Sequence, residues 1–119
     1  MRTIKFKGLS AKGWLYGDLI HNRGKAYIAP IGIASPFAEA GDFEVDESTI
    51  GQHIGLYGKN DEGIYEGDII KLRDGKVYRV GYEQGRAMFS LYEGSKSTDI
   101  YALPISGAKI IGNIHDVKD

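Results

Sequence analysis

One group of carboxylates in the 119-residue chain comprises Asp61, Glu62, Glu66 and Asp68. Paired carboxylates can perform acid–base chemistry or hold a divalent cation. The spacing here lacks the Asp-x-Asp-x-Asp-Gly order of a calcium loop. Glu66 and Asp68 also flank a glycine, in a turn where carboxylates commonly accept backbone amides. We therefore favour backbone capping over catalysis, and we expect no metal ion and no cofactor.

The other residue types that carry chemistry are scattered or absent. His21, His53 and His115 are too far apart for a local motif such as His-x-x-x-His. They could converge in the fold, although solvent-facing strand histidines are the commoner outcome. The chain has no cysteine, which excludes disulfides, thiolate metal sites and cysteine nucleophiles. Because no serine lies in a nucleophile-elbow sequence either, we expect a protein that is not an enzyme.

Basic residues after the acidic group provide one binding hypothesis. The candidates for binding nucleic acid or a partner are Lys71, Arg73, Lys76, Tyr78 and Arg86. A basic, aromatic-containing face could hold phosphates and stack bases. The simpler interpretation is a solvated strand face whose charges discourage edge pairing. The net charge of -1 gives no long-range attraction toward nucleic acid or an anionic membrane.

Tyrosines provide the other binding hypothesis, a contact with an unknown protein or with a second copy of the chain. Tyrosine is enriched at protein interfaces. The residues concerned are Tyr16, Tyr57, Tyr65, Tyr82, Tyr92 and Tyr101. For most of them we expect partial burial, with the hydroxyl at the rim of the core. A homo-oligomer is one form such a contact could take.

The segments that position these residues are predicted to be short strands. In the first half the predicted strands are 4–9, 14–21, 26–29, 43–45 and 53–56. Alternation in the first of these places Lys5 and Lys7 on its solvent face. Residues 31–42 are predicted as a loop with at most one helical turn, and residues 46–49 as a turn capped by Asp46. Gly17-Asp18 and Gly67-Asp68 each precede two aliphatic residues, which suggests that both halves begin a main strand in the same way.

In the second half the predicted strands are 69–73, 76–83, 86–92, 100–103 and 109–114, with a polar loop at 93–99. A two-residue loop at Asp74-Gly75 would place Leu72 opposite Val77. A similar loop at Gln84-Gly85 would place Val80 opposite Phe89. Because Val77 and Val80 are an odd number of residues apart, these apolar sets would fall on opposite faces of a regular strand. We therefore predict a β-bulge within residues 78–81, which would curl the sheet toward a barrel.

Four blocks of sequence, in order along nearly the whole chain, carry a family resemblance. They are Trp14-Leu15-Tyr16-Gly17-Asp18-Leu19-Ile20, Gly51-Gln52 with Gly55-Leu56, Ile64-Tyr65-Glu66-Gly67-Asp68-Ile69-Ile70, and Ile110-Ile111-Gly112-Asn113-Ile114. With these blocks the chain resembles the YopX family, small proteins encoded by phages, prophages and mobile elements of bacteria. The resemblance implies a mainly β fold whose C-terminal part is a small curled barrel. It implies no particular biochemical activity.

These observations predict a single YopX-like domain, 1–119, with an N-terminal β subregion (1–50) and a C-terminal small-barrel subregion (51–119). The predicted class is mainly β, with two small β units, a curled Src-homology-3-like barrel in the second and little helix; the alternative is α+β. Gly17, Asp18, Gly51, Gln52, Gly55, Gly67 and Asp68 are interpreted as structural. No apolar run approaches the length of a transmembrane helix, so we expect a cytoplasmic protein. Its expected function is that of an accessory protein acting by protein contact or self-association, with nucleic-acid binding as the alternative.

Overall fold

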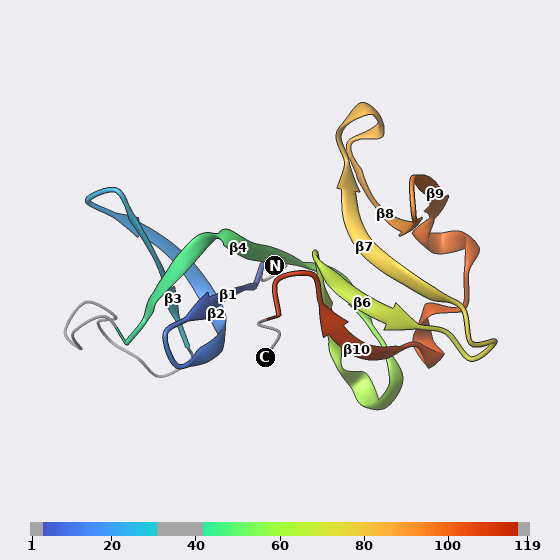
Figure 1. The fold of residues 1–119 in the computed structure, drawn as a ribbon, viewed down its shortest axis with the longest axis horizontal. Coiled ribbons are helices and arrows are strands. Elements are labelled where there is room, and N and C mark those ends of the chain that lie inside the picture. The colour runs from blue at the N-terminus through green and yellow to red at the C-terminus, as the bar shows by residue number, and fades with distance from the viewer. Residues whose placement is uncertain (1–3, 31–41, 117–119) are drawn as a thin grey trace. The chain divides into compact units, whose positions relative to one another are not determined.

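The computed structural model describes residues 4–30 and 42–116, which are mostly β-strand (Figure 1). The chain divides into two compact units, Met1–His53 and Ile54–Asp119. In the described residues the helical segments are short 3-10 turns, and none of them could span a membrane. The mainly β class with two small β units is therefore confirmed. The loop expected at 31–42 lies, except for Asp42, outside the described residues.

The N-terminal unit is built from antiparallel neighbours. β1 (Phe6–Ser10), β2 (Gly13–Asn22) and β3 (Lys25–Ala29) pair in succession, and β1 also pairs with β4 (Glu44–Tyr57). Among the described residues β3 meets β4 through two residue pairs, so the ring of strands closes only partly. A small core holds the ring together. It consists of Ala26, Ile28 and Val45, with Phe6, Leu15, Leu19 and Ile50 packed against them.

β4 is longer than the sequence predicts, because the turn expected at 46–49 is absorbed into the strand as an irregularity. Asp46 does accept the Ser48 amide at 3.0 Å and the Ser48 hydroxyl at 2.8 Å. The hydroxyl of Thr49, however, receives the Leu9 amide of β1 at 2.9 Å. The β1–β4 register shifts at this point, between Lys7 and Leu9. Cross-strand hydrogen bonding therefore keeps residues 46–49 within β4, although their side chains favour a turn.

The C-terminal unit contains a five-stranded sheet in the order β10-β6-β7-β8-β9. Its strands are β6 (Asp68–Lys71), β7 (Val77–Glu83), β8 (Met88–Glu93), β9 (Lys96–Asp99) and β10 (Lys109–Asn113). The last residues of β4 pair with β5 (Gly63–Tyr65). The 3-10 turns are η1 (Lys59–Asp61), η2 (Gln84–Arg86), η3 (Ile100–Ala102) and η4 (Ile105–Gly107).

One core joins both parts of this unit. It is formed by Ile54, Ile64, Ile70, Leu72, Tyr78, Val80, Leu91, Ile100 and Ala108. Ile54 and Ile64 come from β4 and β5, whereas the five-stranded sheet and the turns around it supply the rest. The second unit is therefore a small β unit around one core, and in the described residues the pairing of its five-stranded sheet runs from β10 to β9 without closing into a barrel.

The bulge predicted within residues 78–81 is wrong, and the reason is the length of one loop. Lys71 pairs with Val77, and the Leu72 amide donates to the Lys76 carbonyl at 2.9 Å, so three residues (73–75), not two, form the loop between β6 and β7. This one-residue change puts Tyr78 and Val80 on the same, buried face and leaves Val77 exposed by 42%. The loop between β7 and β8 is also longer than predicted. Val80 nevertheless lies on the buried face of β7, because it pairs with the buried Leu91. β7 is regular throughout.

A second error concerns residues 93–103. The polar segment predicted as a loop contains β9, which pairs with β8 after a turn at Gly94, and the predicted strand 100–103 begins with η3. Gly94 has φ +60°, which suits it to a tight turn. Asp99 then caps η3 by accepting the Tyr101 amide at 2.9 Å. The prediction assigned strands by hydrophobicity, whereas this polar segment forms a strand because β8 lies beside it to pair with.

Candidate functional site

The Gly67-Asp68 motif organises a buried hydrogen-bond network. Asp68 is 1% exposed. One oxygen of its carboxylate, Oδ2, accepts the Tyr65 amide at 2.8 Å, and the other, Oδ1, accepts Asn113 Nδ2 at 3.0 Å. The two hydrogen bonds of this carboxylate therefore stabilise the β5–β6 turn and connect β10 to it.

Asn113 extends this network into the C-terminal segment. Its side-chain oxygen accepts the His115 amide at 2.9 Å, and its own amide donates to Asp116 Oδ2 at 2.8 Å. Gly67 has φ +93°, and a Cβ there would lie 3.2 Å from Asn113 Nδ2. The turn therefore requires a glycine.

The acidic residues do not assemble into a metal site. Asp61 and Glu62 are exposed in and beside η1, whereas Asp68 faces the buried network. Among the described residues no three or more His, Cys, Asp or Glu side chains are placed to hold a metal ion. The histidines do not converge there either, and His21 instead lies 3.3 Å from Glu47.

The Gly17-Asp18 motif differs from Gly67-Asp68, so the expected parallel between the halves does not hold. Gly17 lies within β2 opposite Phe6, and its φ is +155°. A Cβ there would collide with the carbonyl of Ala29 on β3. Asp18 is exposed, and its side chain makes no hydrogen bond to another described residue. The glycine allows β2 and β3 to approach closely, whereas the aspartate side chain does not cap a turn.

The Gly51-Gln52 block and Gly55 belong to β4. Gly51 pairs with Lys7 and Gln52 with Phe6, so both lie in the N-terminal ring. Gly55 follows just after the boundary between the units, with φ +86°. Glycine adopts this backbone conformation without strain.

The five residues proposed to form a binding face are not brought together. Lys71, Arg73 and Lys76 gather around the β6–β7 loop, and all three are exposed. Tyr78 is 7% exposed within the core, so it cannot stack bases. Arg86 lies in η2 beyond the opposite end of β7, with Nη1 3.9 Å from Glu83 Oε2. That the remaining basic residues bind a ligand stays a prediction.

Sequence reasoning missed one member of this basic group. Lys109 of β10 is the direct cross-strand partner of Lys71. The alternation in residues 109–113 predicted a strand, but only the β10–β6 register decides which residue faces Lys71. No local pattern could have revealed the pair.

Lys7 is buried, contrary to the solvent-facing prediction. It is 5% exposed, and its Nζ atom lies 4.5 Å from the ring centroid of Trp14 and 5.5 Å from that of Tyr16. Both aromatic residues come from β2, in which Tyr16 pairs with Lys7. The cation is thus placed where the ring quadrupoles stabilise it.

The tyrosines are more exposed than expected. Tyr65 is 7% exposed and Tyr92 is intermediate. The other four are exposed by 44% or more, namely Tyr16, Tyr57, Tyr82 and Tyr101. Four of the six tyrosines are therefore more open to solvent than the partial burial expected for most of them.

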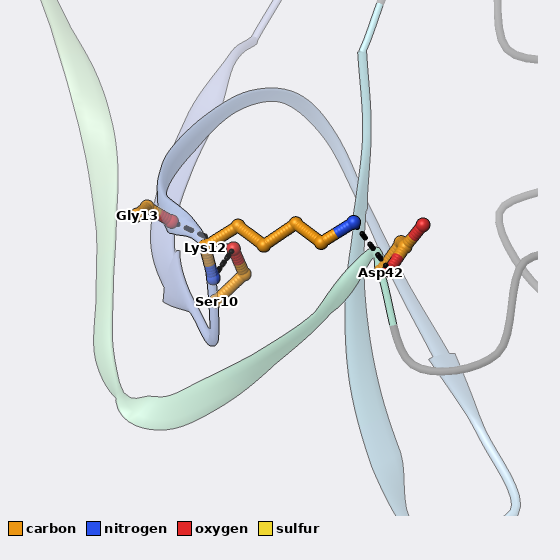
Figure 2. Close-up of polar contacts among 4 residues, drawn as sticks. All are labelled: Ser10, Lys12, Gly13 and Asp42. Carbon is orange, nitrogen blue, oxygen red and sulfur yellow. Dashed lines mark hydrogen bonds and ion pairs between the residues drawn. The ribbon is translucent and has the colours of Figure 1, made fainter.

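A shallow groove of about 420 Å³ lies in the N-terminal unit, lined by Leu9, Ser10, Ala11, Glu44, Val45 and Asp46. The polar groups in and beside the groove form hydrogen bonds and an ion pair within the protein. Figure 2 shows the Ser10 hydroxyl donating to the Gly13 carbonyl at 2.7 Å and accepting the Lys12 amide at 3.2 Å. Lys12 also reaches Asp42 at 3.1 Å (Figure 2). Ser10 is therefore a turn residue, and no histidine lines the groove to activate it.

A family model described as YopX protein matches residues 8–117. The chain belongs to the YopX family. A comparison with curated proteins finds no match. In this YopX-family chain the blocks 64–70 and 110–114 meet through the Asp68–Asn113 hydrogen bond. Two of the most identifiable stretches of the sequence thus contribute to one structural network.

Proposed function

We propose that this YopX-family chain is a non-enzymatic accessory protein of a bacterial phage or mobile element, and that it acts in the cytoplasm through protein–protein contact. We further propose that the contact is self-association. The family resemblance supports the setting. The proposal of contact rests chiefly on one observation, an aromatic pair at the loop end of the β7–β8 hairpin in which Tyr82 is exposed and Phe89 is partly buried against the core.

This pair consists of Tyr82 and Phe89, which are cross-strand partners. Their ring centroids are 5.3 Å apart in an edge-to-face arrangement with an interplanar angle of 77°. They lie on the hairpin face that also carries the buried Val80 and Leu91, yet Tyr82 is 44% exposed. The loop end of the hairpin projects beyond the neighbouring strand β6 (Figure 1). Rigid, preorganised aromatic side chains in such a position are typical of interface centres.

The charges beside this pair support a second copy as the partner. Glu83 and Arg86 lie between Tyr82 and Phe89 in the sequence, at the loop end of the same hairpin, and Glu83 Oε2 is 3.9 Å from Arg86 Nη1. Glu83 pairs with Met88, so its side chain leaves β7 on the opposite face from Tyr82. A two-fold interface places each surface against itself, so both signs must be present on the same patch. At the loop end of the hairpin, Glu83 of one copy can then face Arg86 of the other, beside the packed aromatic rings.

Sedimentation velocity over a concentration series tests this proposal. We expect a reversible dimer that Tyr82→Ser weakens by about tenfold or more, as loss of an interface anchor does. Tyr57→Ser is the matched control, because Tyr57 is also a strand tyrosine and is exposed by 52%. A strictly monomeric protein at about 100 µM would exclude self-association with any appreciable affinity.

Charge exchange tests the geometry of the dimer. Glu83→Arg alone and Arg86→Glu alone should each weaken it, because like charges would then face each other across the two-fold axis. The double exchange should restore association. If the single variants dimerise as the wild type does, the proposed orientation is wrong.

A further inference from the structure

The outer face of the C-terminal sheet carries two lysines that are direct cross-strand partners. Lys71 of β6 pairs with Lys109 of β10, and both are exposed. Like charges directly opposite each other destabilise a sheet. In the described part of the chain neither lysine has an ion-pair partner that would offset this repulsion. An anionic ligand would supply the missing charge.

A third cation lies on the same face. Arg79 of β7 pairs with Ile69, two residues before Lys71, so it is a diagonal neighbour of Lys71. Its guanidinium carbon lies 4.5 Å from the ring centroid of its other partner, Tyr92 of β8. Arg79 also has no ion pair among the described residues. A planar cationic stack therefore lies beside the lysine pair.

Gly81 leaves room for this stack. A Cβ at Gly81 would lie 2.8 Å from Tyr92 Cε2 and 2.9 Å from Arg79 Nη1. The absence of a side chain lets the guanidinium and the phenol ring lie low over β7 and β8. Arg79 and Tyr92 are both partly exposed, so the stack leaves surface on which a further planar group can stack.

Two more cations extend the positive surface past Lys71. Arg73 and Lys76 are exposed on the β6–β7 loop. The Arg73 side chain lies across the backbone of Gly107, since a Cβ there would collide with it. This places Arg73 beside the chain that leads into Lys109. Asp74, in the same loop, accepts the Lys76 amide at 2.9 Å.

Three further carboxylates lie on or beside this face, and each accepts a hydrogen bond. Asp99, opposite Ser90 on β9, accepts the Tyr101 amide at 2.9 Å. Asp116 lies 3.2 Å from the Cβ position of Gly112 and receives the Asn113 amide. Glu83, at the far end of β7, accepts the Ser90 hydroxyl at 3.2 Å. The centre of the face, around Lys71, Lys109 and Arg79, therefore stays positive.

We propose that this face binds single-stranded nucleic acid. Lys71 and Lys109 hold backbone phosphates, and the Arg79–Tyr92 stack receives an unpaired base. Cations arranged beside a stacking platform are the combination that single strands require. A duplex hides the faces of its bases, and an acidic peptide would use the lysines without the stack. This surface is separate from the aromatic pair proposed for self-association, so either proposal can fail alone.

Fluorescence anisotropy with a labelled mixed-sequence oligonucleotide of about twenty nucleotides tests the phosphate contacts. We expect binding at about 50 mM salt that the double variant Lys71→Gln/Lys109→Gln weakens by about tenfold or more. Loss of two phosphate contacts should also flatten the slope of log K against log salt by about 1.4. Lys96→Gln is the matched control, because it removes an exposed charge from β9 of the same sheet. Absence of binding, or equal loss in the control, overturns the proposal.

A second variant tests the base contact. Tyr92→Leu keeps an apolar side chain over Gly81 but removes the ring, so we expect weaker binding with an unchanged salt slope. Thermal melting of each variant shows whether the fold is intact. Equal or tighter binding of a matched duplex, or of a poly-glutamate peptide, would overturn the assignment to single strands.

Discussion

Asp68 Oδ1 accepts a hydrogen bond from Asn113 Nδ2 across 3.0 Å, although the two residues are 45 positions apart in the sequence. The same carboxylate holds the Tyr65 amide, and the same asparagine holds the His115 amide. One buried pair therefore links the β5–β6 turn, β10 and the C-terminal segment. Because both side chains are buried, removing either leaves polar groups without partners.

The first prediction concerns this pair. Asp68→Ala should lower the free energy of unfolding by about 2–4 kcal/mol, since the Tyr65 amide and the Asn113 amide group lose their acceptor. Urea denaturation followed by circular dichroism measures the change. Asp18→Ala is the matched control from the other Gly-Asp motif, and we expect it to change stability by about 0.5 kcal/mol at most because Asp18 is exposed. A double-mutant cycle with Asn113→Ala should show a coupling of at least about 0.5 kcal/mol.

The second prediction tests the length of the β6–β7 loop. Tyr78→Ala should cost about 3 kcal/mol or more, because Tyr78 is in the core. Val77→Ala should cost less than about 1 kcal/mol, because Val77 is exposed by 42%. A two-residue loop would turn Val77 inward and reverse this order. Urea midpoints for the two variants therefore distinguish the two registers directly.

The third prediction concerns the buried lysine. Lys7→Ala should lower stability by about 1–2 kcal/mol, because it removes both the cation–aromatic contacts and the packing of the lysine stem. Lys7→Met should recover the part that comes from packing. Trp14 is the single tryptophan of the chain, so its fluorescence follows unfolding of this unit. Lys5→Ala serves as the control, since Lys5 is exposed. Equal effects at both positions would show that the burial of Lys7 contributes nothing.

The fourth prediction concerns close strand approach in the N-terminal unit. Gly17→Ala should cost about 2–4 kcal/mol, because the new methyl group would collide with the Ala29 carbonyl. Backbone atoms cannot move aside as a flexible side chain can. Gly85→Ala is the control, because a Cβ there meets nothing within 4 Å. If the two variants melt at the same temperature as each other, β2 and β3 are farther apart than described.

Much of the architecture could be predicted from local patterns. Alternating apolar residues indicated most of the strands, and glycine-containing turns such as Gly67-Asp68 marked where several of them begin. The absence of cysteine excluded thiol chemistry, and the wide spacing of the histidines excluded a local histidine motif. These properties depend on residues close together in the sequence, and for them propensity and alternation suffice.

The tertiary structure decided which side chains meet. One extra loop residue before Val77 reversed the face predicted for it, because strand side chains alternate with a period of two. Lys7 lies against two rings that only strand pairing brings near, and Lys71 faces Lys109 only through the β10–β6 register. β9 exists because β8 offers its polar residues a neighbouring strand. Register and cross-strand partners depend on contacts between distant segments, so the sequence alone determined most of the strands and several of their turns, whereas the fold determined the register and the surfaces.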